Sequence, residues 1–482
     1  MEMEPTSLEK AGFCAGAWLL LKGLPEKLKH KVAELASKAI KLGKDDPRRV
    51  VHSLKVGLAL NVVSLLYYLR PLYNDFGVSA TWAIMTVVFV FEYSVGATLG
   101  KGLNRGFATF IGGALSVGAH QIACLSGEKA EPIMLGLFVF LQAAASTFLR
   151  FFPKIKARYD YALLIFILTF SMISVSGFRD DEIIDLARRR LLTILIGGFV
   201  CVIICILICP VWAGQDLHNL IATNIDKLGN FLEGFGNEYF NKEGETEDDK
   251  SFLQQYKSVL TSKSTEESLT NSAKWEPGHG QFQFRHPWNL YLKIGTLTRQ
   301  CAYRIDALNG YLNAEIQTSS EMRYKIEEVY REMSLESGKA LKELALAIKT
   351  MSQPSAATKT HIENSKSAAK SLNSLFKSNI WGDTDLQAAV PVAAVASLLI
   401  DVVACTEKIA QSVYELASMA NFKSIEVTLS PEKSQIRQQD NAKSLAKVDD
   451  CPYVCVTVNE PTPAISGNGY PSLTMPTRIS ES

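Results

Sequence analysis

Three basic residues open the first long apolar segment of the chain. Arg48, His52 and Lys55 are four and three residues apart. In a helix this spacing places all three on one face, so positive charge runs from the helix end into the apolar part. Fixed cations in a low-dielectric environment attract anions strongly, and the pattern therefore predicts an anion path. The alternative stays open that Lys55 snorkels to the surface and that Arg48 anchors the helix end.

Further basic residues gather at both ends of the apolar segments. On the side of the N-terminus they are Lys101, Arg105, Lys154, Lys156 and Arg158, and on the opposite side they are Arg188, Arg189 and Arg190. Positive charge at both mouths suits a pore that conducts anions. Glu92 is the only formal charge between Trp82 and Leu99. Because an acid is costly in lipid and repels anions, we expect Glu92 to face protein or water and to pair with a basic neighbour.

Acidic residues cluster in front of the last apolar segment. They are Asp180, Asp181, Glu182 and Asp185, and Asp75 lies on another turn predicted to be on the same side. Carboxylate oxygens are the ligands that a small, hard, highly charged cation prefers, so the cluster predicts a cation site. The alternative is a solvated acidic loop that balances the neighbouring arginines. Both interpretations stay open.

The elements that position these residues are six apolar runs, each about long enough to cross a bilayer. They cover residues 50–69, 80–99, 106–124, 132–150, 160–177 and 190–211. An even number of spans puts both ends of the chain on one side of the membrane. Basic residues before the first run and in the second and fourth turns place that side in the cytoplasm, against the evidence of the arginine triplet at 188–190.

The stretch 81–106 predicts a helix, a glycine-spaced basic turn and a second helix. Its sequence GATLGKGLNRG differs from a phosphate-binding loop, because only three residues separate Gly96 from Gly100 and because Gly102 stands where a Ser or Thr must bind magnesium. A nucleotide site is therefore rejected. The glycine pairs 96/100 and 102/106 have instead the spacing that lets backbones approach closely.

After residue 210 the composition changes to charged, amphipathic segments. Helices are predicted near 215–235, 289–312, 320–351 and 385–421, and polar loops at 241–250 and 263–274. The aromatic loop WEPGHGQFQFRHPW, which contains His279 and His286, predicts domain packing or contact with the membrane half.

The predicted fold class is an all-α membrane protein with six transmembrane helices followed by a cytosolic helical domain. The predicted divisions are a cytosolic or interfacial segment at 1–46, with a basic amphipathic helix over 26–46, a membrane domain at 47–212, a cytosolic domain at 213–424 and a disordered tail at 425–482.

Composition and spacing argue against several other functions. A net charge of +1 does not suit a nucleic-acid-binding protein. Cys201, Cys205 and Cys209 follow helical spacing within one apolar run, where we expect reduced, structural thiols. Only His52 and His120 fall in the membrane half, and neither is predicted to have a second metal-ligating His or Cys at suitable spacing. No nucleophile turn is present, so neither an enzyme nor a cofactor is predicted.

Four stretches, in the same order, resemble the plant aluminium-activated malate transporter family of anion channels. They are WAIMTVVFVFEYSVGATLGKGLNRG, RFFPKIKARYDYALLIFILTFSMISVSGFRDDEI, CPVWAGQDLHNL and KWEPGHGQFQFRHPWNLYLKIGTLTRQCAYRIDALN. The similarity covers most of residues 47–430. The resemblance implies a channel for malate and inorganic anions, with permeation associated with Lys55, Glu92, Lys154, Lys156, Arg188 and Arg189. It also suggests external aluminium as the cation for Asp75, Asp181, Glu182 and Asp185.

The resulting prediction is a multi-pass protein of the lipid bilayer that lets anions leave the cell passively. Each elementary charge that leaves gains roughly 2.3 kcal/mol at 100 mV, inside negative. We expect a homodimer, since six spans with few polar residues enclose a wide pore poorly, and on resemblance alone we favour the plasma membrane over the vacuolar membrane. Two alternatives stay open. One is a proton-coupled exporter with Glu92 as the proton carrier, and the other is a membrane-anchored scaffold, which has no need for Lys55 within a span.

Overall fold

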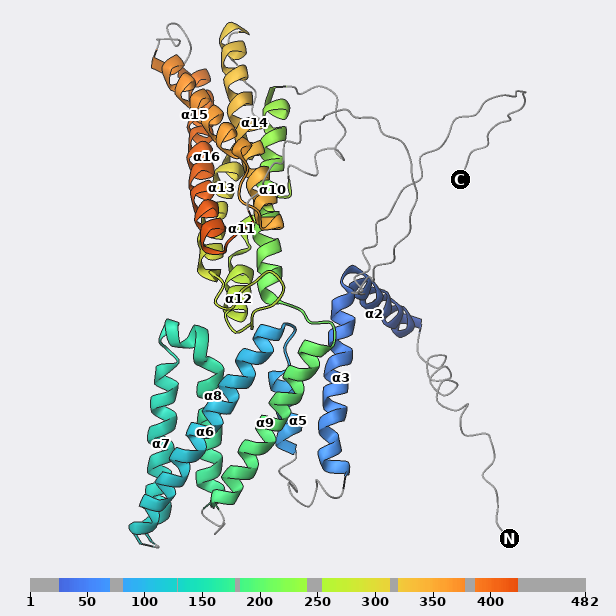
Figure 1. Ribbon diagram of the computed structural model, residues 1–482, viewed down its shortest axis with the longest axis vertical. Coiled ribbons are helices and arrows are strands. Elements are labelled where there is room, and N and C mark those ends of the chain that lie inside the picture. The colour runs from blue at the N-terminus through green and yellow to red at the C-terminus, as the bar shows by residue number, and fades with distance from the viewer. Residues whose placement is uncertain are drawn as a thin grey trace, which may run out of the picture. The chain divides into compact units, whose positions relative to one another are not determined.

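The computed structural model describes residues 26–69, 81–127, 129–177, 183–240, 254–312, 320–377 and 386–423. The chain divides into two compact units, Met1–Glu426 and Val427–Ser482, and the described residues all belong to the first. They form α-helices joined by short turns, with isolated bridges in place of any sheet (Figure 1). The predicted tail at 425–482 and the predicted loop at 241–250 lie outside the described residues.

The first half of the chain contains a short amphipathic helix and a set of apolar helices. The helices are α2 (Glu26–Asp45), α3 (Pro47–Tyr68), α5 (Thr81–Val90), α6 (Val95–Leu125), α7 (Glu131–Leu149), α8 (Pro153–Gly177) and α9 (Ile183–Leu207). Within the described residues, six helices are long and apolar enough to cross a membrane. They are Pro47–Tyr68, Val95–Leu125, Glu131–Leu149, Arg158–Ser176, Ala187–Leu207 and Val390–Met419. The predicted fold class, an all-α membrane protein, is confirmed.

The turn expected at 99–106 is wrong, because the chain turns earlier. The break lies at 91–94, and α6 then runs unbroken through the basic residues to Leu125. Ser94 begins α6 because its hydroxyl accepts a hydrogen bond from the Ala97 amide at 3.3 Å. Each interior glycine costs a helix only about 1 kcal/mol, which tertiary packing offsets. Before the turn, the second predicted span therefore contains only α5 among the described residues, about 15 Å long at 1.5 Å per residue.

The close approach predicted for Gly96 and Gly100 is confirmed, but their partner is the second half of the chain. A Cβ atom on Gly96 would collide with the carbonyl oxygen of Ser272, and one on Gly100 would lie 2.7 Å from the Trp275 indole. At Gly102 and Gly106 the nearest atoms would be 3.5 Å away, which is ordinary contact. The first glycine pair thus joins the start of α6 to the segment around α12.

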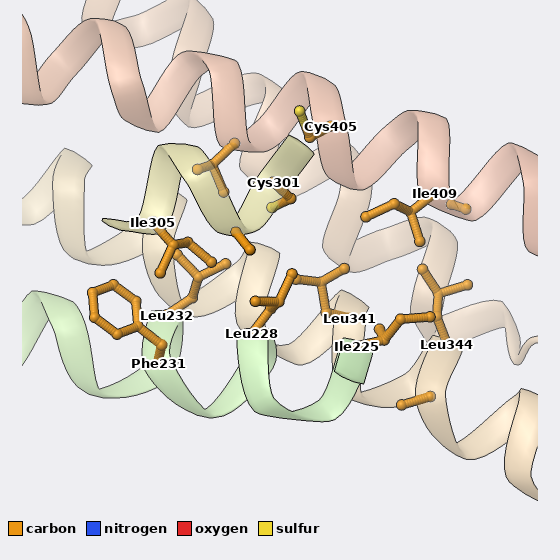
Figure 2. Close-up of a cluster of buried hydrophobic side chains, with 14 of the residues drawn as sticks. Ile225, Leu228, Phe231, Leu232, Cys301, Ile305, Leu341, Leu344, Cys405 and Ile409 are labelled. Carbon is orange, nitrogen blue, oxygen red and sulfur yellow. The ribbon is translucent and has the colours of Figure 1, made fainter. Parts of the chain in front are cut away.

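The second half of the chain is a helical bundle. Its helices are α10 (Ala213–Phe240), α11 (Lys257–Leu260), α12 (Lys263–Ala273), α13 (Trp288–Tyr311), α14 (Ser320–Thr350), α15 (Ala356–Lys377) and α16 (Leu386–Met419). Figure 2 shows side chains from four of them meeting in one core: Ile225, Leu228, Phe231 and Leu232 of α10, Cys301 and Ile305 of α13, Leu341 and Leu344 of α14, and Cys405 and Ile409 of α16. The four predicted bundle helices are confirmed.

Three bundle helices were not predicted: the short α11, α12 and α15. Residues 263–274 were expected to be a polar loop, but α12 forms there because Glu266 and Thr270 are buried against the bundle. The helix α15 was not predicted from apolar periodicity because its buried face is largely Thr, Ser and Ala.

The helix α16 belongs to the bundle although its composition would suit a membrane span. Its apolar face lies in the core, and its opposite face carries acids that pair with bundle lysines. Lys293 contacts Glu415 at 2.7 Å, and Lys366 contacts Glu407 at 2.7 Å. A one-sided apolar stripe with a charged outer face is typical of a helix packed in water.

Candidate anion-binding site

Two buried arginines lie among the apolar helices. Arg105 of α6 is 2% exposed and Arg190 of α9 is 4% exposed. Arg105 donates from Nη1 to the Tyr161 hydroxyl of α8 at 3.1 Å. The guanidinium carbon of Arg190 lies 3.9 Å from the centroid of the Trp82 ring of α5, a cation–π contact. The two arginines and the rings that they contact therefore come from four helices, α5, α6, α8 and α9, whose ribbons lie side by side in Figure 1.

Neither of these two arginines has a carboxylate partner within the described residues. The Nε atom of each is buried without a hydrogen-bond partner there, and the two arginines lie on the packed helices α6 and α9. A buried charge without a counter-charge is strongly unfavourable. An anion that enters between α5, α6, α8 and α9 would neutralise them, so the pair of arginines defines the candidate anion-binding site.

Glu92 and Lys101 form an ion pair beside this site. The expectation that Glu92 pairs with a basic neighbour is confirmed. The ammonium group of Lys101 also lies 5.7 Å from the centroid of the Tyr161 ring, the same tyrosine that Arg105 contacts. Lys101 and Arg105 are one helical turn apart on α6. Because Glu92 compensates only Lys101, the charge on Arg105 remains available to an anion.

The three basic residues that were predicted to share one face of α3, Arg48, His52 and Lys55, each contact different neighbours. Lys55 is 2% exposed and donates from Nζ to the carbonyl of Cys209, just after α9, at 2.8 Å. The cation thus satisfies a carbonyl at the negative end of a helix. The His52 ring packs against Phe91 and Tyr93, with centroid separations of 5.7 and 5.5 Å.

Arg48, at the start of α3, contacts the bundle. Arg48 binds Asp46 and also Asp216 of α10, at 3.2 and 3.1 Å. No described contact brings Arg48, His52 or Lys55 together with Arg105. The three residues share a helix, as predicted, but their role in permeation stays a prediction.

The remaining basic residues lie nearer the helix ends. Lys154 and Lys156 are exposed in the first turns of α8. Arg158 lies 5.6 Å from the centroid of the Trp275 ring, at the contact with the bundle. The side chains of Arg188 and Arg189 both bind Asp185 one turn earlier on α9.

Of the predicted cation ligands, only Asp185 lies within the described residues. Asp75, Asp181 and Glu182 fall outside them. Both carboxylate oxygens of Asp185 accept from arginines, Oδ1 from Arg188 at 2.8 Å and Oδ2 from Arg189. These two hydrogen bonds lower the pKa of Asp185. A cation at this position must therefore compete with two guanidinium groups.

The joint between the membrane half and the bundle is built around Glu276. Its carboxylate accepts the amides of Ala213 at 2.6 Å and Gly214 at 3.0 Å, the first two residues of α10. The His279 ring stacks on Trp212 with centroids 3.8 Å apart. The aromatic loop that contains these residues was predicted to contact the membrane half, and this is confirmed.

The burial of Arg190 was not predicted from the sequence, in which Arg190 forms one triplet with Arg188 and Arg189. Consecutive residues on a helix point about 100° apart, so three successive arginines cannot share one face. Only the third is buried, while the first two reach Asp185. The apolar run that follows Arg190 is the signal that it already lies inside the membrane.

These features define a class of protein: a multi-pass helical membrane protein with buried cations that have no carboxylate partner among the described residues, and with a helical bundle attached after the last membrane helix. A family model described as aluminium activated malate transporter matches residues 40–381. The chain belongs to the aluminium-activated malate transporter family.

Relatives of high sequence identity are named as members of this family. The chain is 57% identical over 399 residues to aluminum-activated malate transporter 2 of Arabidopsis thaliana, covering 82% of this chain and 79% of the relative. It is 52% identical to transporter 7 of the same plant over 453 residues, covering 87% and 89%. It is 47% identical to aluminum-activated malate transporter 1 of Triticum aestivum over 434 residues, covering 87% and 93%.

Proposed function

We propose that this protein is an anion channel that lets malate and inorganic anions leave the cell passively. The observation that carries the proposal is the pair Arg105 and Arg190, buried among four membrane helices without a carboxylate partner in the described part of the chain. The names of the relatives supply malate as the substrate.

The chemistry of the site suits a small dicarboxylate. A guanidinium group is planar, stays charged and binds a carboxylate through two parallel hydrogen bonds. Two guanidinium groups match the two charges of malate, and a chloride or nitrate ion needs only one. Because each outgoing charge gains roughly 2.3 kcal/mol at 100 mV, a dianion gains about twice that without an energy source.

The Glu92–Lys101 ion pair supports the channel over a proton-coupled exporter. A proton carrier must give up its negative charge during each cycle, whereas Glu92 has a lysine against its carboxylate. A membrane-anchored scaffold gains nothing from two buried arginines that have no carboxylate partner among the described residues. Both features favour a passive path for anions.

A homodimer is the assembly that we propose, in the plasma membrane and with both termini in the cytoplasm. Large apolar side chains on α6 and α9 are exposed on the single chain, including Phe107, Phe110 and Phe199. Such a surface suits lipid or a second copy. The preference for the plasma membrane rests on the resemblance alone.

The test is whole-cell recording with malate, and then chloride, as the only permeant anion. Arg105→Gln and Arg190→Gln should each lower the malate current at least tenfold at equal surface density, because each removes a fixed charge from a low-dielectric passage. Chloride current should fall less than malate current.

Arg304→Gln is the matched control, since Arg304 lies in the bundle, is partly exposed and is already paired with Asp401 at 3.7 Å. Its current should stay within about twofold of wild type, as expected for an exposed ion pair. Wild-type malate current in both buried-arginine variants would overturn the proposed function, as would a current that follows the pH gradient instead of the anion gradient.

A further inference from the structure

A cluster of metal-binding side chains joins the end of α6 to the start of α7. His120 and Cys124 are one helical turn apart on α6, and Glu131 is the first residue of α7. One ligand atom from each residue can be chosen so that all three lie within 4.8 Å of one another. The expectation that His120 has no suitably spaced Cys is therefore wrong, because Cys124 follows it by four residues.

The distances suit a tetrahedral metal ion better than hydrogen bonds. The Cys124 Sγ atom lies 3.5 Å from His120 Nε2 and 3.7 Å from Glu131 Oε1. Bonds of about 2.3 Å to sulfur and about 2.0 Å to nitrogen or oxygen, at the tetrahedral angle, place such ligand pairs about 3.5 Å apart. A thiol is only a weak hydrogen-bond donor, so hydrogen bonds alone give little reason for this convergence.

The surroundings of His120 and Cys124 also support metal binding. The His120 Nδ1 atom is buried without a hydrogen-bond partner in the described part of the chain, and it lies 3.9 Å from Glu131 Oε1. A metal-bound histidine usually turns its second nitrogen toward a carboxylate or carbonyl, which this geometry allows. The Cys124 side chain is exposed, so an ion can reach the sulfur.

We propose that His120, Cys124 and Glu131 bind a divalent transition-metal ion of the zinc type, with a fourth position open to water. One nitrogen, one sulfur and one oxygen ligand are typical of Zn²⁺. The set does not suit hard cations such as Ca²⁺, Mg²⁺ or Al³⁺, which bind oxygen ligands. The site is thus chemically distinct from the acidic cluster that contains Asp185.

The helix α6 also places the site relative to the membrane. Its first turn contacts the bundle through Gly96 and Gly100, and His120 and Cys124 lie in its last two turns. A helix of 31 residues is about 45 Å long, which exceeds the bilayer core of about 30 Å. The site is therefore at the face opposite the bundle, where ions outside the cell reach it, and it ties α7 to the helix that contains Arg105.

The first experiment measures Zn²⁺ binding to the purified full-length protein in detergent by calorimetry. We expect wild type to bind one ion per chain at this site, and Cys124→Ser, His120→Ala and Glu131→Gln each to weaken that binding at least tenfold. Cys209→Ser is the matched control, because Cys209 is also an exposed free thiol but lies in no described metal-binding group. It should bind as wild type does.

The second experiment uses the thiol itself as the reporter in intact cells. A membrane-impermeant maleimide should label Cys124 from outside, Zn²⁺ should block the labelling, and Mg²⁺ should not. In His120→Ala the thiol remains, so labelling should persist but Zn²⁺ protection should fall at least tenfold in potency. Zn²⁺ binding and protection that are unchanged in His120→Ala and Glu131→Gln would overturn the proposal, as would labelling from the cytoplasmic side only. Neither readout depends on anion current.

Discussion

Buried arginines are neutralised differently in the two halves of the molecule. In the bundle, the Arg299 guanidinium binds Glu266, whose carboxylate also accepts from the Ser262 hydroxyl at 2.7 Å. In the membrane half, the described contacts of Arg105 are the Tyr161 hydroxyl and the Phe89 ring, and Arg190 contacts the face of the Trp82 ring. The bundle thus supplies a counter-charge for its buried arginine, whereas the described residues of the membrane half supply no carboxylate for Arg105 or Arg190. In the proposed channel, a passing anion takes that place.

The comparison also separates structural stability from function. Removing one partner of a buried ion pair leaves an uncompensated charge and typically costs about 3 to 5 kcal/mol. Removing a buried charge that has no partner relieves the protein of that cost. The same kind of substitution should therefore have opposite effects on stability in the two halves.

The largest expected effect is the loss of stability in Glu266→Gln. It leaves Arg299 buried without its counter-charge, and we expect a loss of about 3 to 5 kcal/mol in unfolding free energy. Arg190→Met should leave thermal stability unchanged or raise it while the malate current disappears. Heat unfolding of the full chain in detergent measures the stability of both variants, and whole-cell recording measures the malate current. A destabilisation of Arg190→Met equal to that of Glu266→Gln would contradict the comparison.

The next effect is a pH dependence confined to the bundle. The Tyr291 hydroxyl is hydrogen-bonded to His218 Nδ1 at 2.9 Å and to His286 Nε2 at 3.2 Å. Burial lowers the pKa of both His218 and His286 to about 4, from an ordinary value near 6.5. Folding thus favours the neutral rings, so stability is complete above about pH 6.5 and is lost as the pH falls toward 4.

By pH 5 each histidine should reduce the unfolding free energy by on the order of 2 kcal/mol. Replacing His286 with Gln removes one of these contributions and should make the unfolding temperature fall less between pH 7 and pH 5. The exposed His30 of α2 offers the control, since His30→Gln should keep the wild-type pH dependence. An equally steep fall in His286→Gln would show that these rings do not set the acid sensitivity.

A smaller effect is expected at Lys55, where structure and conduction compete as explanations. Lys55→Ala should lower conductance or change selectivity, because it removes a fixed charge from the membrane interior, and Lys55→Arg should retain more current. The alanine variant also leaves the Cys209 carbonyl without its donor, at a cost of about 1 to 3 kcal/mol. Single-channel conductance at equal surface density separates the two explanations. Wild-type conductance and selectivity in Lys55→Ala would place Lys55 outside the pore.

The sequence predicted the helices well, but the partners of the charged residues less completely. Periodicity and run length located α3, α7, α8, α9 and most of the bundle, because hydrophobic pattern is a local property. The turn at 91–94 was missed because glycines at 96–106 looked like a break, whereas they lie inside a helix, with Gly96 and Gly100 packed against Ser272 and Trp275. The contact of Arg190 with Trp82 joins positions far apart in sequence, and no local pattern indicates it.

The acidic cluster before α9 allows a last, smallest effect to be predicted. Asp185 is half-exposed and binds two arginines, and such exposed pairs contribute at most about 1 kcal/mol to stability. Asp185→Asn should therefore leave the unfolding temperature nearly unchanged. Its effect should instead appear in the response to external aluminium, because a trivalent ion on the carboxylates frees Arg188 and Arg189 and raises the positive potential at the outer mouth.

Malate currents recorded with and without micromolar external aluminium test this prediction. Activation should be smaller in Asp185→Asn and in Glu182→Gln than in wild type. Arg188→Gln sharpens the test, because it removes one of the two competitors for Asp185 and should lower the aluminium concentration needed for activation. Activation that is undiminished in both acid variants would rule out the proposed aluminium site. The arginines at this mouth would then be neutralised within the chain, as Arg299 is in the bundle, and the uncompensated charge would be confined to Arg105 and Arg190.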